Sequence, residues 1–270
     1  MNQQEKAARL RELHHAGDPL VFVNAWDCVT ARILETMNAS AIATSSAAIA
    51  NVHGFRDGQG MSRAAMLDAV CAIVAAVCVP VSADLEGGYG ESVDDAIATA
   101  NGAIDAGAVG LNFEDASDDG LLSTDLQSRR IRAIRQVGTQ RGVDLVINAR
   151  TDVYLKSIGA PEGRFAATLE RAKAYVEAGA DCIFVPGVSD SGTIAKLVQA
   201  IAAPLNILAG ANTPSVSELG RLGVRRISCG GAPHGHVMAA FQKVVADVAE
   251  LGTFDFASDR ISHADLNALF

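Results

Sequence analysis

The sequence predicts an α/β fold, a TIM-type (β/α)₈ barrel built as a single domain. Its 270 residues alternate short apolar stretches with longer amphipathic ones, the pattern of strands that are each followed by a helix. Apolar residues make up 49% of the chain and aromatic residues only 5%, which suits buried parallel strands under Ala-rich helices. No glycine-rich phosphate turn follows the first predicted strand, which disfavours the alternative of an open, doubly wound sheet.

Each predicted strand is a short apolar stretch with a polar or small residue at or near its C-terminal end. Eight such stretches are present, which is the number that closes a barrel of this type. They are expected at residues 20–24, 41–45, 81–84, 110–114, 145–150, 182–185, 205–208 and 226–229.

Amphipathic segments after the strands predict the outer helices. Gly107, Gly179 and Gly223 each end a predicted helix just before a strand, as glycine commonly does. A further helix at residues 4–13 precedes the first strand, and we expect it to plug the barrel floor or to pack outside. The outer helices are expected at residues 28–37, 62–77, 92–106, 124–141, 161–178, 190–201, 215–222 and 234–251.

Composition narrows the class of protein. The formal net charge of −9 argues against nucleic acid or an anionic membrane as a partner. No stretch of about 18 apolar residues could form a membrane-spanning helix, and the polar N-terminal segment lacks the apolar core of a secretion signal. The five cysteines are scattered without a Cys-x-x-Cys pair, which predicts reduced thiols in a cytoplasmic protein. We expect a barrel domain over residues 1–254 and a C-terminal tail over residues 255–270, after a polar break.

Polar residues gather where the predicted strands end, which is where barrels of this kind place their active sites. The acidic ones are Asp84, Glu86 and Glu114, with Asp57 on the long loop after the second strand. Carboxylates that converge on one mouth repel one another unless a cation lies among them. Mg²⁺ prefers such oxygen ligands, and Mn²⁺ is an alternative. A single Asp at a strand end is more often a helix cap, so the prediction of a metal site depends on the joint placement of the four carboxylates.

Other residues at the strand ends suit a small anionic carboxylic acid as ligand. Arg150, at the end of the fifth strand, offers a guanidinium fork to a carboxylate. Ser45 and Ser46 lie at the end of the second strand and would hold the other end of the ligand. Two simpler interpretations stay open: Glu114 could pair with Arg150 as a purely structural bridge, and the charged run at residues 115–119 is expected to be a solvated loop.

Several segments resemble the isocitrate lyase / phosphoenolpyruvate mutase superfamily, and in particular its small bacterial members near methylisocitrate lyase. The resemblance implies a (β/α)₈ barrel whose last helix is swapped between subunits, in a homodimer or homotetramer with the tail of residues 255–270 at the interface. The similar segments span residues 20 to 230, and they are NAWDCVTARILE, ATSSAAIANVHGFRDG, VSADLEGGYGE, GLNFEDA, INARTD, AYVEAGADCIFVPG, PLNIL and LGVRRISCGG.

The resemblance also assigns roles to individual residues. It implies that Asp84 binds Mg²⁺ and that Asp57, Glu86 and Glu114 hold the water molecules of the metal. Among these acidic residues, Glu114 and Asp57 are also predicted to be catalytic.

On the substrate side, the resemblance implies that Ser45 and the backbone N–H of Ser46 cradle a substrate carboxylate. Arg150 would contact the substrate oxygens and is the third predicted catalytic residue. Asn206 stands where lyase members of the superfamily bind a distal carboxylate.

Three departures from the superfamily pattern bear on the activity. The usual Asp-x-Asp is Asp84-Leu85-Glu86 here, and the stretch after Glu114 has no counterpart of the Lys-Cys-Gly-His loop of the lyases. The histidine that the mutase has after the sixth strand is Pro186. We therefore expect a Mg²⁺-dependent lyase that cleaves a C–C bond of a small 2-hydroxy or 2-oxo di- or tricarboxylic acid through an enolate, including decarboxylation of an oxaloacetate-like acid. The alternatives are a C–P bond enzyme of the mutase or phosphonopyruvate hydrolase type and a barrel that binds a 2-oxo acid without turning it over.

Overall fold

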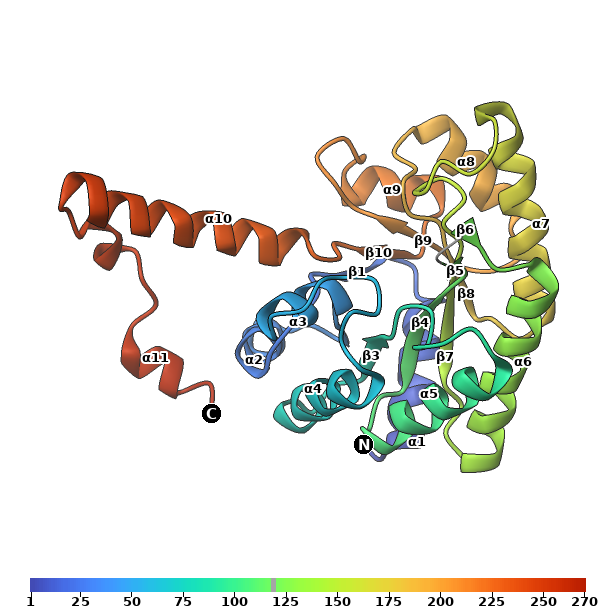
Figure 1. Ribbon diagram of the computed structural model, residues 1–270, viewed down its shortest axis with the longest axis horizontal. Coiled ribbons are helices and arrows are strands. Elements are labelled where there is room, and N and C mark those ends of the chain that lie inside the picture. Colours follow the sequence, from blue (N-terminus) through green and yellow to red (C-terminus); the bar gives the residue numbers. More distant parts are fainter. Residues whose placement is uncertain (118–119) are drawn as a thin grey trace.

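The computed structural model describes residues 1–117 and 120–270, and it contains one eight-stranded parallel barrel (Figure 1). Neighbouring strands follow the order β1-β10-β9-β8-β7-β4-β3-β2. A parallel bridge between Ala25 and Thr44 joins the ends of β1 and β2, which closes the circle. This confirms the predicted (β/α)₈ fold. The strands are β1 (Leu20–Phe22), β2 (Ile42–Ala43), β3 (Val81–Asp84), β4 (Gly110–Glu114), β7 (Val146–Arg150), β8 (Cys182–Phe184), β9 (Leu205–Leu208) and β10 (Arg226–Ser228).

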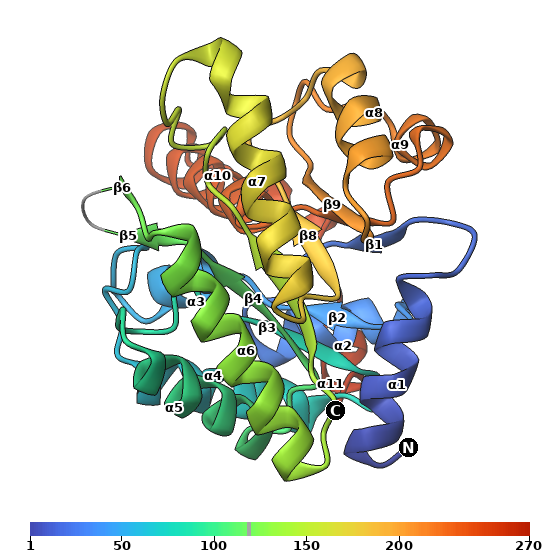
Figure 2. The ribbon, with the colours of Figure 1, turned by 90° about the vertical axis from the view of Figure 1, so that its right-hand side faces the viewer.

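The outer helices begin and end close to the predicted residues. Most begin at a Ser or Asp whose side chain accepts a hydrogen bond from the backbone of the first turn, for example Ser62 and Ser92. Figure 2 shows α5, α6 and α7 side by side around the barrel. The helices that follow the strands are α2 (Cys28–Thr36), α4 (Arg63–Ala76), α5 (Val93–Asp105), α6 (Thr124–Arg141), α7 (Arg164–Glu177, after a 3₁₀ turn at Pro161–Gly163), α8 (Ser191–Ala200), α9 (Val216–Leu222) and α10 (Ala232–Ala246).

Three short elements in loops at the C-terminal ends of the strands were not predicted. Helix α3 (Ser46–Val52) follows β2 directly, and the strands β5 (Ala116–Ser117) and β6 (Gly120–Leu121) form a small antiparallel hairpin after β4. These pieces are too short to show a periodic pattern in the sequence. They matter because they shape the mouth of the barrel.

Helix α1 (Gln3–Leu13) closes the opposite end of the barrel. Leu10 is fully buried, and the Arg11 guanidinium donates to the Asp144 and Leu145 carbonyls just before β7. The side chain of Gln3 likewise donates to the Ile104 and Ala108 carbonyls. Of the two predicted positions for this helix, the structure therefore shows the barrel floor.

Helix α10 leaves the barrel instead of packing on its side (Figure 1). Its apolar residues are exposed, including Phe241 at 62%. A π-helical turn (Asp247–Leu251), a 3₁₀ turn (Asp255–Ser258) and α11 (His263–Asn267) follow it. The chain thus departs from the barrel body before residue 254, and the boundary at that residue and the exchange of this helix between subunits stay predictions. No helix in the described part of the chain is long and apolar enough to cross a membrane.

Candidate active site

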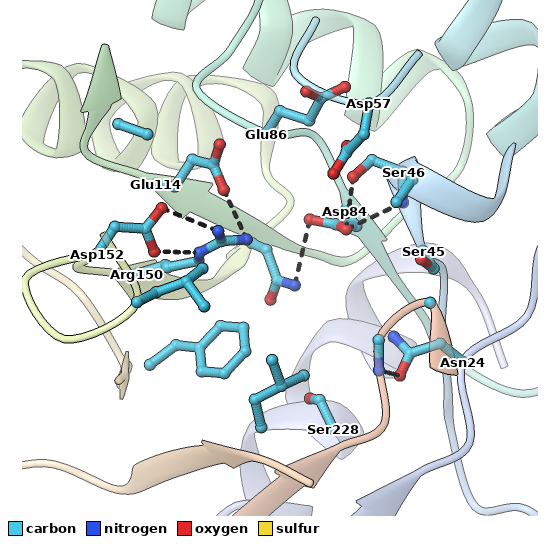
Figure 3. Close-up of a pocket in the computed structure, with 18 of the residues that line it drawn as sticks. Asn24, Ser45, Ser46, Asp57, Asp84, Glu86, Glu114, Arg150, Asp152 and Ser228 are labelled. Carbon is cyan, nitrogen blue, oxygen red and sulfur yellow. Dashed lines mark hydrogen bonds and ion pairs between the residues drawn. The ribbon is translucent and has the colours of Figure 1, made fainter. Parts of the chain in front are cut away.

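A cavity of about 500 Å³ opens at the C-terminal ends of the barrel strands (Figure 3). This volume is typical of sites for small molecules. All the predicted site residues except Asn206 line it. The polar side chains of the lining include Asn24, Ser45, Ser46, Asp57, Gln59, Asp84, Glu86, Asn112, Glu114, Arg150, Asp152, Lys156 and Ser228.

Asp84 is the last residue of β3, and its carboxylate is held from two sides. The backbone N–H and the hydroxyl of Ser46 donate to one carboxylate oxygen at 2.9 and 2.8 Å, and the Asn112 amide donates to the other at 3.3 Å. Asn112 is in turn oriented by Asn148 and Arg226, which both donate to its carbonyl oxygen at 2.6 and 3.2 Å. The carboxylate that the sequence predicted as the metal ligand therefore has a defined orientation at the cavity wall.

Glu86 lies in the loop that follows β3, with a left-handed backbone (φ 51°) that is costly for a residue with a side chain. The surrounding loop keeps it there: Arg130, itself fully buried, donates to the carbonyls of Gly87 and Gly90. The Glu86 carboxylate accepts the backbone N–H of Gln59, in the same loop as Asp57. Glu86 thus joins the loop after β3 to the loop between α3 and α4.

Arg150, at the end of β7, is held between two carboxylates. Its Nη1 lies 2.7 Å from Glu114, the residue opposite it in the β4–β7 register. Its Nε and Nη2 donate to the two oxygens of Asp152 at 2.6 and 2.9 Å. The ion pair between Glu114 and Arg150, which the sequence analysis gave as one alternative, is therefore present. These contacts with Glu114 and Asp152 use three of the five guanidinium N–H groups, so two others can bind a ligand.

Two carboxyl groups at the mouth of the cavity, Glu86 and Glu114, have raised pKa values. Burial, reinforced by Asp84 and Asp57, raises the pKa of Glu86 to about 7. Burial also raises the pKa of Glu114 to about 8, because it outweighs the attraction of Arg150. A cation among these side chains would relieve the cost of their negative charge.

The arrangement suits a cation held mainly through solvent. Within residues 1–117 and 120–270, no three Asp, Glu, His or Cys side chains converge closely enough to form a complete protein ligand set. Mg²⁺ commonly binds through one or two carboxylates and keeps several water molecules. Asp84 as direct ligand, with Asp57, Glu86 and Glu114 nearby, fits that mode and the roles that the sequence predicted.

Ser45 and Ser46 both line the cavity, as expected for a carboxylate cradle. Ser45 caps α3, and its hydroxyl accepts the Ala48 N–H at 3.4 Å. The Ser46 hydroxyl and N–H are already bound to Asp84. Contact of either serine with a substrate stays a prediction.

Asn206 is a correction to the predicted site. It is fully buried in β9 and does not reach the cavity, because its amide is paired with the Ser228 hydroxyl at 3.1 Å. Ser228, at the end of β10, lines the cavity in its place. Asn206 is in register with Phe184, which lines the cavity, so what separates its side chain from the cavity is the contact with Ser228, which a short apolar stretch does not reveal.

Asp115 is a second correction. The sequence predicted a solvated loop for residues 115–119, but Asp115 is fully buried. Its carboxylate accepts the Asp152 N–H at 3.0 Å and hydrogen bonds from Arg171 at 2.9 Å and Tyr175 at 2.7 Å, both on α7. Asp118 and Asp119 lie outside the described residues.

Several lining residues were not predicted, although each had a partial signal. Asp152 lies two residues after Arg150 in Ala-Arg-Thr-Asp, a spacing that suits bidentate support of the guanidinium. Asn112 lies inside β4 and Asn24 follows β1, so both are polar residues at apolar strands. The Asn24 side chain bridges the barrel closure, from the Thr44 carbonyl to the Gly230 N–H.

The phosphoenolpyruvate phosphomutase family model matches residues 10–249 of this chain. The chain belongs to this family. The match covers all eight barrel strands and the whole of α10, and it confirms the resemblance to the isocitrate lyase / phosphoenolpyruvate mutase superfamily. Members of this superfamily are enzymes that make or break C–C or C–P bonds.

Proteins similar in sequence to this chain include an uncharacterized protein and a lyase. An uncharacterized protein of Mycobacterium tuberculosis is 34% identical over 223 residues, which cover 83% of this chain and 82% of that protein. The 2-methylisocitrate lyase of Halalkalibacterium halodurans is 28% identical over 269 residues, or 96% of this chain and 82% of the lyase.

Solved structures of the family superpose closely on this chain. A proposed phosphonomutase from Burkholderia cenocepacia J2315 is 41% identical, with a TM-score of 0.87 and coverage of 91% of this chain and 99% of that one. A phosphonopyruvate hydrolase in complex with oxalate and Mg²⁺ shares the fold at 21% identity, with a TM-score of 0.86 and coverage of 100% and 95%. The Mg²⁺ and the oxalate belong to that hydrolase, and at this identity the likeness to this chain is one of fold.

Proposed function

We propose that this protein is a Mg²⁺-dependent lyase that cleaves a C–C bond of a small 2-hydroxy or 2-oxo di- or tricarboxylic acid. The observation that carries the proposal is that Asp84, Arg150 and the two carboxylates of raised pKa, Glu86 and Glu114, line one cavity together. When bound, Mg²⁺ would supply charge stabilisation for the 2-oxo acid as negative charge develops on it. Mn²⁺ would serve the same role.

The protein side chains would bind and orient the substrate. Arg150 is fixed by Glu114 and Asp152, so its two remaining N–H groups are aimed before the ligand arrives. Such preorganisation lowers the entropic cost of reaching the reactive geometry. Asp84 would hold the cation, and Asp57, Glu86 and Glu114 would accept hydrogen bonds from its water molecules.

Bond cleavage leaves an enolate that must take up a proton. The described lining contains no counterpart of the cysteine loop of the lyases, although Cys229, after β10, is among the lining residues. We propose that a water molecule held by the acidic side chains delivers this proton. Retro-aldol cleavage and decarboxylation of an oxaloacetate-like acid both end in such a protonation.

A second candidate is a C–P bond enzyme that acts on phosphonopyruvate. It is favoured by the 41% identity to the proposed phosphonomutase, which is higher than the identity to the 2-methylisocitrate lyase. Both activities would use the same cation and Arg150. Their products differ, so one assay separates them.

The test is a substrate panel with purified protein and Mg²⁺: oxaloacetate, methylisocitrate, isocitrate, dimethylmalate and phosphonopyruvate. We expect pyruvate, glyoxylate or CO₂ from one of the carboxylic acids, with loss of the activity on chelation. Asp84→Asn should reduce the rate by about 100-fold or more, because the amide carries no charge for the cation. Phosphate or phosphoenolpyruvate from phosphonopyruvate would favour the second candidate, and oxalate binding without turnover would indicate a binding protein.

A further inference from the structure

The proposed substrates carry a second carboxylate that also needs a partner in the cavity, since an anion that loses its water shell must be paired. Among the lining residues that the structure describes, only Arg150 and Lys156 carry positive charge. Arg150 already has a carboxylate at each end of its guanidinium, Glu114 and Asp152. The positive charge of Arg150 is therefore largely balanced before any substrate binds.

Lys156 is the other cation, in the loop that follows β7. Its Nζ donates to the backbone carbonyls of Ser117 at 3.1 Å and Gly120 at 3.4 Å, on the β5–β6 hairpin. An ammonium group has three N–H donors, and among the residues that the structure describes these two bonds occupy two of them. The carbonyls orient the ammonium at the hairpin wall without neutralising its charge.

The volume of the cavity and the distribution of charge in it both favour binding of a second ligand group beside Lys156. The cavity of about 500 Å³ is several times larger than a three-carbon 2-oxo acid needs. The acidic side chains of Asp57, Asp84 and Glu86 would repel a second carboxylate near the cation site. Asn206, which the resemblance suggested for the distal carboxylate, is buried outside the cavity.

We propose that Lys156 forms an anion subsite that binds the distal acidic group of the substrate, and that this residue selects dianionic over monoanionic 2-oxo acids. The inference rests on the proposed function in one respect, namely that the 2-oxo acid end binds beside Asp84 and Arg150. The Ser117 and Gly120 carbonyls aim the ammonium. Lys156 thus acts as a specificity-determining residue.

The test compares two five-carbon ligands that cannot undergo the proposed cleavage, 2-oxoglutarate and 2-oxovalerate, which differ only in a terminal carboxylate or methyl group. Their Kd values with Mg²⁺ are measured by calorimetry for the wild type, Lys156→Met, Lys156→Arg and the control Lys173→Met on α7. Lys156→Met should weaken 2-oxoglutarate binding about tenfold or more, the usual size for loss of a charge-assisted hydrogen bond. Binding of 2-oxovalerate and of oxalate should change by less than about twofold. Lys156→Arg should retain most of the preference, and Lys173→Met all of it.

Two results would overturn the inference. Equal binding of 2-oxoglutarate by the wild type and Lys156→Met would show that no anion subsite exists. An equal loss for both acids and for oxalate would mean that Lys156 only fastens the hairpin to the loop. If the wild type binds none of the three ligands with Mg²⁺, the proposed function itself fails, which is a separate outcome.

Discussion

Arg150 shows at the scale of single residues how the site is prepared before a ligand binds. The guanidinium plane is fixed by two oxygens of Asp152 and one of Glu114, and the Asp152 N–H is in turn held by buried Asp115. A lysine at this position would keep the charge but lose the fork geometry.

We therefore expect Arg150→Lys to lower kcat/KM by about 10- to 100-fold, mostly through a higher KM. Steady-state kinetics on the substrate identified in the panel measure this effect. Arg164→Lys, at the start of α7, where the guanidinium donates to the backbone carbonyls of Ser157 and Gly159, is the matched control and should leave both constants unchanged. A normal KM in Arg150→Lys would show that the fork does not contact the substrate.

Glu86 and Glu114 predict how stability depends on pH in metal-free protein. Their folded-state pKa values are raised to about 7 and about 8, chiefly by burial, from an ordinary value of 4.5. Folding therefore favours their neutral forms. The stability they contribute is full below pH 4.5 and is lost as the pH rises through 7 to 8.

The Tm of chelator-treated protein should accordingly fall by several degrees between pH 5.5 and 8.5, measured by differential scanning calorimetry. Glu114→Gln and Glu86→Gln should each flatten the profile, because an amide does not titrate. Asp125→Asn, at an exposed position of α6, should leave its slope intact. A profile that is flat in the wild type would contradict the raised pKa values.

At the scale of elements, strands and outer helices were predictable because apolar periodicity and capping residues are local signals. The carboxylates Asp84, Glu86 and Glu114 were predictable for the same reason, since parallel strands bring their C-terminal ends together. Asp115 was not, because its partners Arg171 and Tyr175 come from α7, more than fifty residues later. A run of charged residues predicts a solvated loop, and the sequence does not show when the fold places buried partners beside one of them.

Asp115 connects α7 with the loop that carries Asp152, because its carboxylate accepts hydrogen bonds from both. Replacing it by alanine removes the carboxylate that pairs with Arg171 and leaves the buried Asp152 N–H without its acceptor. We expect Asp115→Ala to lower the free energy of unfolding by about 3 kcal/mol, measured by urea denaturation. Asp125→Ala, whose side chain is 79% exposed and paired with Arg129, should cost less than about 0.5 kcal/mol. Equal losses for the two variants would show that the buried network adds no stability.

At the scale of the whole molecule, α10 is the feature that the barrel alone does not explain. It extends from the barrel with Val237, Phe241 and Val245 exposed at 46, 62 and 51%. A helix with so much apolar surface in water is costly unless a partner covers it. This agrees with the dimer or tetramer that the family resemblance implies, which stays a prediction.

Phe241→Glu should therefore shift the molecular mass in solution toward the monomer, measured by light scattering on a size-exclusion column. The charge on the helix would oppose burial at a subunit interface. Lys173→Glu, a charge change at the exposed surface of α7, should leave the mass unchanged. A wild-type protein that is monomeric, or a Phe241→Glu mass equal to that of an oligomeric wild type, would contradict this role for α10.

The sequence by itself determined the eight strands, the helices between them and the acidic and basic residues at the strand ends, because these depend on local periodicity and on the parallel order of a barrel. Only the tertiary structure decided which side chains face the cavity. Pairing with Ser228 keeps Asn206 from lining the cavity, and packing against α7 buried Asp115. The loops placed Asp152 and Lys156 in the wall, since their positions depend on contacts between segments far apart in the chain.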